Sequence, residues 1–447
     1  MSEALTRVNA ALEEDAPALF RLLSPLGRRA VFPPGIPFQA AEARGKRFNG
    51  TIGQVTDGHG AAVPLPSLAA GLGALAEDGP LGAAAKNRAL LYSPVEGMRE
   101  VRELWRLRQR RDAPDGAASS LPQVVDGLTH ALSIVADLFA GEGRTVVVPD
   151  PFWGNYRGCF EVRTGARLVA APSYRDRRFD PAALAAALDE LPDGEPAIAV
   201  ANFPSNPGGY SPTAGQRTAL AASLAAAAER RPLMVVCDDA YAGLVFDDPE
   251  ADEPVPRASL FWELVGRHDN LVPVKVDGAT KELAFFGGRV GFLTFGFDPD
   301  SAAAVALESK IKFLLRATVG SPVAATQALV AQALGSPTLE EEFEAVRRLL
   351  ADRVAVLREA LAACDEALFR PLPFNAGCFA LVELTPAADG GAGLDPEALR
   401  RHLLDHHEVG LVSIQPRYLR IAHCSVDAAD LPELVRRMEA GARELAG

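Results

Sequence analysis

A lysine in the segment GATKELAFFGGRVGF (278–292) is surrounded by small residues, and an arginine follows it eight positions later, beside two glycines. A lysine on a protein surface needs no such neighbours. A lysine that reacts with a carbonyl or carries a proton must first lose its own proton, and a pocket that withholds water lowers the pKa of an amine. The segment therefore predicts a buried, reactive amine at Lys281, with a fixed cation nearby at Arg289.

Other polar or aromatic groups also follow apolar runs that are typical of strands. VVCDDAY leads to Asp238 and Tyr241, AIAVANFPSNPGG leads to Asn206, and TVVVPDPFWGNY leads to Trp153. Ligands of an open parallel sheet bind at the carboxyl ends of its strands. Together with Lys281, which follows the run VPVKVDGATK, these residues predict a ligand site along one edge of a sheet.

The segments that must position these residues alternate between short apolar runs and helical stretches. From about residue 85, the runs RTVVVPD, ARLVAA, AIAVANFP, LMVVCDD, LVPVKVDG and GFLTFG are bounded by turn residues and separated by helix-forming segments. This alternation indicates the α/β class, with a mostly parallel sheet covered by helices on both faces. A long helical segment (338–364) is followed by GCFALVEL, DPEALRRHLLDHH and YLRIAHC, which predict a second, smaller α+β domain.

The composition limits the kinds of partner and the cellular compartment that we expect for this chain. The chain has 447 residues, too many for one ordinary core, and a net charge of −13, which argues against a nucleic-acid partner because phosphate binding requires a basic face. The five cysteines contain no CxxC pair and indicate buried thiols rather than a disulfide framework. The acidic N-terminus does not have the pattern of a secretory signal, and no run reaches the ~20 apolar residues of a membrane helix. We therefore expect a cytoplasmic protein with no membrane partner.

Taken in order, the motifs resemble those of the class I aminotransferases of the pyridoxal-phosphate (PLP) fold-type I family, most closely the aspartate and aromatic aminotransferases. The likeness runs from about Tyr92 to Arg420: ATKELAFFGGRVG resembles the lysine signature, NFPSNPGG the N-P-x-N-P-T-G turn, DDAY the D-E-x-Y strand end, and PDPFWGNY the segment with the stacking tryptophan. The resemblance implies a mostly parallel, seven-stranded-type sheet. It divides the chain into an N-terminal arm with part of the small domain (1–84), a large PLP-binding domain (85–325) and a C-terminal small domain (326–447).

The resemblance implies pyridoxal 5′-phosphate as the cofactor and a role for each residue at the strand ends. Lys281 would form a Schiff base with the aldehyde and then move a proton from the substrate Cα. Asp238 would keep the pyridine nitrogen protonated, while Tyr241 and Asn206 would bond the phenolate oxygen and Trp153 would stack on the ring. On residue type alone, structural alternatives stay open: a core tryptophan, turn chemistry for Asn206, and a helix cap for Asp238.

The phosphate of the cofactor would need donors, and DGLTHAL supplies them. Leu128 and Thr129 begin a predicted helix, where free backbone N–H groups and the helix dipole favour an anion. Both match phosphate-binding positions of the family, and Arg289 would add a bidentate contact. The family often has a serine three residues before the lysine, where this chain has Gly278. Either Thr280 replaces the missing donor, or the phosphate has one donor fewer.

The resemblance also implies small-molecule substrates, an L-amino acid and a 2-oxo acid, that exchange an amino group in a ping-pong cycle. Arg420 matches the arginine that grips the substrate α-carboxylate, and Gly53 matches a glycine beside it. Arg316 resembles an arginine that crosses to the partner subunit and reads the second carboxylate of aspartate or glutamate. Tyr92 resembles a tyrosine that reaches the partner's phosphate, so a homodimer is implied. On residue type alone, Tyr92 and Arg316 are equally consistent with ordinary surface positions.

Two other functions stay open on the sequence. A carbon–sulfur β-lyase or another PLP enzyme could use the same fold and cofactor, because fold does not determine reaction. A non-enzymatic PLP-binding regulator would need about 60 residues of basic helix-turn-helix before the fold, whereas the N-terminal region is short and acidic. We expect no metal site, because none of the seven histidines shows ligand spacing, and the adjacent His406 and His407 cannot face one site from a helix.

Overall fold

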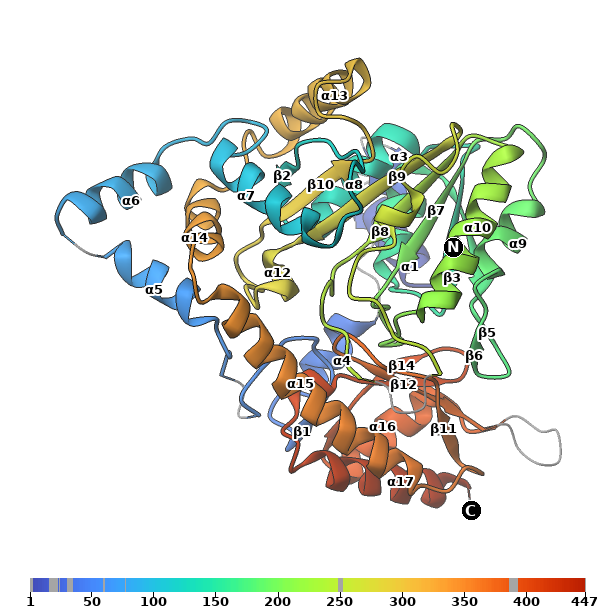
Figure 1. The fold of residues 1–447 in the computed structure, drawn as a ribbon. Coiled ribbons are helices and arrows are strands. Elements are labelled where there is room, and N and C mark those ends of the chain that lie inside the picture. Colours follow the sequence, from blue (N-terminus) through green and yellow to red (C-terminus); the bar gives the residue numbers. More distant parts are fainter. Residues whose placement is uncertain are drawn as a thin grey trace.

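A seven-stranded sheet occupies one half of the molecule, and helices lie on both of its faces (Figure 1). The computed structural model describes residues 3–15, 23, 25–29, 35–58, 61–76, 78–247, 252–385 and 393–446. The strand order is β2-β10-β9-β8-β7-β3-β4. The strands from β9 to β4 run parallel, and β10 is antiparallel to both of its neighbours. The expected α/β class with a mostly parallel sheet is confirmed.

The central strands are apolar almost throughout, as expected for a sheet that is buried on both faces. The strands of the sheet are β2 (Gln123–Val125), β3 (Thr145–Asp150), β4 (Arg167–Pro172), β7 (Ala197–Asn202), β8 (Leu233–Asp238), β9 (Leu271–Gly278) and β10 (Gly291–Phe295). All but β2 follow the apolar runs seen in the sequence. β2 has three residues, too few to form a recognisable run.

Each face of the sheet has its own core. On one face, α8 packs on β9 and β10, with Leu132 and Val276 in one buried cluster. On the other face, α9 packs on β3 and β4, with Leu184 and Val147 in a second cluster. The helices that flank the sheet are α7 (Arg99–Gln109), α8 (Leu128–Phe139), α9 (Ala183–Asp189), α10 (Ala214–Glu229) and α11 (Phe261–Leu264). This double cover fixes the positions of the strand ends.

A second unit, built mainly from the C-terminal part of the chain, has its own antiparallel sheet of order β11-β12-β15-β14. Its elements are α15 (Leu339–Ala362), β11 (Phe369–Pro371), β12 (Ala380–Leu384), α16 (Pro396–His406), β13 (Val409–Gly410), β14 (Val412–Ile414), β15 (Tyr418–Ile421) and α17 (Leu431–Ala446). The short β1 (Phe48–Asn49) pairs in parallel with β13, so an N-terminal segment lies against this unit. The domain boundaries at 84/85 and 325/326 stay predictions.

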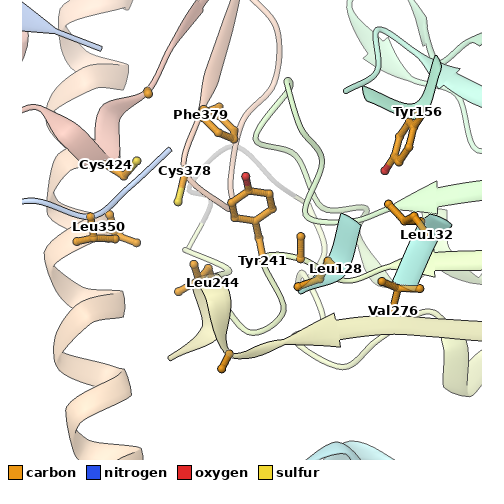
Figure 2. Packing of buried hydrophobic residues seen from close by; sticks show 14 of the residues in the cluster. Leu128, Leu132, Tyr156, Tyr241, Leu244, Val276, Leu350, Cys378, Phe379 and Cys424 are labelled. Atoms are coloured by element: carbon orange, nitrogen blue, oxygen red, sulfur yellow. The ribbon is translucent and has the colours of Figure 1, made fainter. Parts of the chain in front are cut away.

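The two units share one continuous core (Figure 2). Tyr241, just after β8, packs its ring edge-on against Phe379, with 5.6 Å between ring centroids. Figure 2 shows Tyr241 among Leu128 of α8, Phe379 and Cys378. Leu350 of α15 belongs to the same buried cluster. The C-terminal unit is therefore held against the end of the large sheet where the parallel strands terminate.

The remaining elements connect these units or extend from them. They are α1 (Glu3–Asp15), α3 (Pro25–Arg29), α4 (Ile36–Glu42), α5 (Pro66–Ala74), α6 (Pro80–Leu90), β5 (Tyr174–Arg175), β6 (Arg178–Phe179), α12 (Ala279–Glu282), α13 (Ala302–Thr318) and α14 (Ala324–Leu334), with 3-10 turns at 110–112 and 423–425 and a π-helix at 157–162. In the described ranges, no helix combines the length and the apolar character needed to cross a membrane.

Candidate active site

A cavity of about 280 Å³ lies at the carboxyl ends of β7 and β8, beside the N-terminus of α8 and against the C-terminal unit. All the site residues predicted from the sequence line it, except Tyr92 and Arg316. A larger hollow of about 820 Å³ lies between α7 and α13, but none of the described residues that line it is a lysine, and its Arg99 is paired with Glu103 at 2.7 Å. The smaller cavity therefore holds the candidate site.

Lys281 lies in α12, the single helical turn that follows β9. Its Nζ is 5.5 Å from the centroid of the Tyr241 ring. Burial lowers the pKa of Lys281, the carboxylate of Asp238 opposes this shift, and the charge of Arg289 adds to it. The local structure therefore shifts this amine toward its neutral form, and a reactive role for Lys281 stays a prediction.

Gly278, at the end of β9, has no space for a side chain. A Cβ there would lie 2.6 Å from the carbonyl oxygen of Val290 and 2.8 Å from Cα of Gly291. A serine would therefore require this part of the backbone to move. Thr280 lies in the cavity wall, and its hydroxyl accepts a 3.4 Å hydrogen bond from Nη1 of Arg289. A hydroxyl donor is thus present two residues after the glycine.

Asp238, the last residue of β8, is buried, and its carboxylate has two donors in the described chain. The hydroxyl of Tyr156 donates to Oδ2 at 2.6 Å, and the backbone N–H of Ala240 donates to Oδ1 at 3.3 Å. Burial raises the pKa of Asp238 to about 6, against the opposing effects of the Tyr156 hydrogen bond and the charge of Lys281. The carboxylate can therefore hold a cationic group that enters the cavity.

Tyr156 was missed by the sequence analysis, although it stands in the quoted segment PDPFWGNY. Its side chain is fully buried and lines the cavity beside Trp153, with 5.6 Å between the ring centroids. Tyr156 is three residues after Trp153, the spacing that puts two side chains on one face of a helical turn. That spacing was the signal that could have identified it.

Asn202 and Asn206 fix the turn that follows β7. The side-chain oxygen of Asn202 accepts from the backbone N–H of Asn206 at 2.8 Å, and its amide donates to the carbonyl oxygen of Asp238 at 2.8 Å. The oxygen of Asn206 accepts from Nη1 of Arg420 at 3.0 Å. Two strand ends and the C-terminal unit are thereby connected. Asn202 is a second residue that the sequence analysis missed.

Arg420, on β15, is a buried guanidinium that faces the cavity. Nη2 donates to the carbonyl oxygen of Thr51 at 2.8 Å, while Nε has no hydrogen-bond partner among the described residues. In the part of the chain that the structure describes, no acidic side chain forms an ion pair with it. Burial lowers the pKa of Arg420 to about 10. A buried cation without a counter-charge is costly, so this position is suited to an anionic ligand.

The ring of Phe379 accounts for the glycine at position 53 and for the placement of Arg420. The guanidinium carbon of Arg420 lies 4.2 Å from the centroid of the Phe379 ring, within the range of a cation–π contact. A Cβ at Gly53 would lie 2.5 Å from Cζ of the same ring. Gly53 therefore allows the ring to support Arg420 from one side. The aromatic residue was not predicted, because its partners are remote in sequence.

The N-terminus of α8 forms the end of the cavity that is suited to a phosphate. Gly127 precedes this helix with a φ of 87° and supplies no side-chain cap, and Leu128 and Thr129 line the cavity. A Cβ at Gly127 would lie 2.2 Å from Nη2 of Arg289, so only glycine lets the guanidinium approach this closely. Backbone N–H groups, two hydroxyls (Thr129, Thr280) and an arginine together match the donors that bind phosphate.

Tyr92 and Arg316 lie outside the cavity of this chain. Tyr92 follows α6 and is 97% exposed, next to Leu90 and Leu91, which are 82% and 62% exposed. Arg316 lies in the last turn of α13 and is also exposed. Both residues were expected to act on the partner subunit, and a single chain does not bring them to the site. Their roles stay predictions.

A buried ionic network lies behind the site, beneath α12. Lys275 of β9 forms ion pairs with Asp239 and, at 3.4 Å, with Asp277. Asp239 also accepts from the hydroxyl of Ser259 at 2.6 Å, and Asp277 accepts from Nε1 of Trp105 at 3.0 Å. The network links the end of β8, which carries Asp238, to the end of β9, which leads to Lys281. Asp239 therefore supports these strands from behind the cavity.

Comparison with known proteins identifies the family. Residues 52–438 match the model of the family "Aminotransferase class I and II". The chain belongs to this family. Among curated relatives, the mitochondrial aspartate aminotransferase of Dictyostelium discoideum is 28% identical over about half of each chain. The mitochondrial aspartate aminotransferase of Xenopus tropicalis is 25% identical over 72% of this chain and 71% of its own length.

Two further matches are a curated relative and a solved structure. An aspartate/prephenate aminotransferase of Cereibacter sphaeroides is 24% identical over 78% of this chain and 83% of its own length. An aminotransferase of Anaerococcus prevotii, 19% identical, has the same fold with a TM-score of 0.77 over 92% of this chain and 98% of its own. The chain is accordingly a PLP-dependent aminotransferase, as its motifs predicted.

Proposed function

We propose that this aminotransferase takes the amino group from aspartate, glutamate or an aromatic amino acid and transfers it to a 2-oxo acid. The observation that carries the proposal is one cavity lined both by the half-buried amine of Lys281 and by the buried guanidinium of Arg420, which has no acidic partner among the described residues. The guanidinium would hold the substrate α-carboxylate in two parallel hydrogen bonds. That grip would orient the bond between Cα and its hydrogen toward Nζ of Lys281.

The described residues offer a suitable contact to each part of the cofactor pyridoxal 5′-phosphate. The N-terminus of α8 with Arg289 and Thr280 would hold the phosphate, and Asp238 would accept from the protonated ring nitrogen. Tyr241 and Asn206 would bond the phenolate oxygen, and Trp153 would cover one face of the ring. The bound cofactor supplies an electron sink next to the substrate Cα. Nζ of Lys281, whose pKa is lowered by burial, would take the proton from the substrate Cα and deliver it to C4′ of the cofactor.

The cavity of one chain offers an apolar surface to the substrate side chain. Ile36, Ile52 and Phe286 line it, and the only cationic side chains among its lining residues in the described chain are Lys281, Arg289 and Arg420. An aromatic side chain fits this surface. A second substrate carboxylate would need Arg316 of a partner subunit, so we propose a homodimer in which Tyr92 and Arg316 cross to the other site. The five free cysteines support a reducing, cytoplasmic compartment.

The decisive experiment is reduction of the cofactor-loaded protein with borohydride, followed by peptide mass mapping. The chain has six lysines, and we expect the pyridoxyl mass on Lys281 alone. Lys281→Ala should carry no label and show no turnover with aspartate or phenylalanine and 2-oxoglutarate. A label on Lys275, or full turnover in Lys281→Ala, would overturn the assignment. Product analysis with cystathionine separates transamination from carbon–sulfur lyase activity.

A further inference from the structure

Two helices of the C-terminal unit bring histidines and a carboxylate together, away from the cavity that holds Lys281. α16 carries His402, His407 directly follows that helix, and α17 carries Glu444. The Nε2 atoms of His402 and His407 lie 2.7 and 3.0 Å from the same atom, Oε2 of Glu444. The possible ligand atoms of these three side chains all lie within 4.8 Å of one another.

The end of α16 makes this convergence possible. The helix ends at His406, and the backbone of His407 leaves the helical region with φ −117° and ψ 1°. The side chain of His407 is therefore free of the helical spacing that governs His402 and His406. Histidines five positions apart thus point to one carboxylate.

Gly441 of α17 leaves the space that the ring of His407 occupies. A Cβ at this position would lie 3.2 Å from Cδ2 and 3.3 Å from Nε2 of His407, and 2.7 Å from Cδ2 of Leu403. Glycine inside a helix is roughly 1 kcal/mol less favourable than alanine. The packing of α16 against α17 at Gly441 therefore stabilises the structure by more than the glycine costs in helix propensity. This packing also orients the imidazole of His407 toward Glu444.

We propose that His402, His407 and Glu444 bind one divalent transition-metal ion of the Zn²⁺ type, which links α16 to α17. Two imidazole nitrogens and one carboxylate oxygen are a ligand set that zinc accepts, with water in the fourth position. Tetrahedral bonds of about 2.0–2.1 Å put ligand atoms about 3.3 Å apart. The two nitrogen–oxygen distances, 2.7 and 3.0 Å, must therefore lengthen by a few tenths of an ångström, and the two histidine nitrogens, which lie within 4.8 Å of each other, must settle at about the same spacing.

The surroundings allow that movement and suit a cation. The side chain of Glu444 is 52% exposed, whereas those of His402 and His407 are 20% and 13% exposed, so the rings are held and the carboxylate can adjust. The nearby Arg437, which donates to the carbonyl oxygen of His407, is paired with Glu433 at 2.9 Å. Its charge is therefore already compensated.

The test is a calorimetric titration of the chelator-treated, cofactor-loaded protein with Zn²⁺, together with its thermal unfolding. We expect one Zn²⁺ per chain and an unfolding midpoint that rises with the Zn²⁺ concentration. Loss of a group that merely supports a ligand lowers metal affinity about 10–100-fold, so His402→Ala and Glu444→Gln should each lower it at least about tenfold. Gly441→Ala keeps all three ligands and should weaken binding by displacing the ring of His407.

The matched control is His268→Ala, which removes a histidine from the turn before β9 and should leave the titration unchanged. Aminotransferase turnover without added Zn²⁺ should be the same in all four variants, which shows that each one folds. Absence of saturable Zn²⁺ binding would overturn the proposal. Binding that survives both His402→Ala and Glu444→Gln would also overturn it, because the ion would then lie elsewhere and the three side chains would form only an ion pair.

Discussion

Replacing Tyr156 with phenylalanine removes one hydroxyl and isolates its hydrogen bond to Asp238. The bond measures 2.6 Å, and both side chains are buried. A hydrogen bond to a charged group contributes about 1.5–3 kcal/mol. At about 1.4 kcal/mol per unit, its loss should raise the pKa of Asp238 by about 1–2 units, above the value of about 6 that burial already produces. Near neutral pH the ionised fraction of Asp238 would then fall by about 2–10-fold, and we expect kcat/KM to fall by the same factor.

The assay is the pH profile of kcat/KM for the wild type and Tyr156→Phe. The acidic limb should move to higher pH in the variant, and the two rates should converge in alkaline solution, where Asp238 is ionised in both. Tyr210→Phe is the matched control, because it also removes a buried tyrosine hydroxyl, one that donates to Gln216 at 2.6 Å outside the cavity. A uniform loss of rate at every pH, with an unmoved acidic limb, would refute the electrostatic reasoning.

Three further predictions concern the substrate contacts and the response to acid. Arg420→Met should lower kcat/KM for every amino donor by at least about tenfold, since it removes charge-assisted hydrogen bonds of about 1.5–3 kcal/mol; an effect on one donor alone would exclude a contact to the α-carboxylate. Arg316→Ala should raise KM for aspartate far more than for phenylalanine, and equal effects would remove the dicarboxylate role. His423 is fully buried, and burial lowers its pKa to about 3. In the unfolded chain His423 takes up a proton near pH 6.5, whereas in the folded chain it does not. Stability present above pH 6.5 should therefore be lost as the pH falls toward 3, at up to about 1.4 kcal/mol per pH unit. His423→Phe should reduce that slope in urea titrations at several pH values, and an identical slope would show that His423 is not its source.

The sequence was sufficient to predict the site residues that directly follow apolar strands. Asp238 and Lys281 stand at the ends of runs whose burial and direction are evident from composition, so their convergence follows from the parallel sheet. Phe379 and Asn202 act through contacts with residues far along the chain, such as Gly53 and the carbonyl of Asp238, which no local pattern reveals.

Two other misses have different physical causes. β2 is too short for a periodic signal, although it pairs with β10 at the edge of the sheet. The convergence of His402 and His407 depends on where α16 ends, and helix ends are the least regular part of a helix. Tyr156 differs from both, because its spacing from Trp153 was visible and only the hydrogen bond to Asp238 required the structure.

The ionic network beneath α12 means that two amines six residues apart have pKa values shifted in opposite directions. Burial by itself would lower the pKa of Lys275, but Asp239 and Asp277 raise it, so this ammonium has no lone pair to offer an aldehyde. Lys281 experiences the same dry interior with less opposing charge, and its pKa is lowered. An electrophile that enters the protein therefore reacts more readily with Lys281 than with Lys275, and the two carboxylates beside Lys275 provide this chemical selectivity.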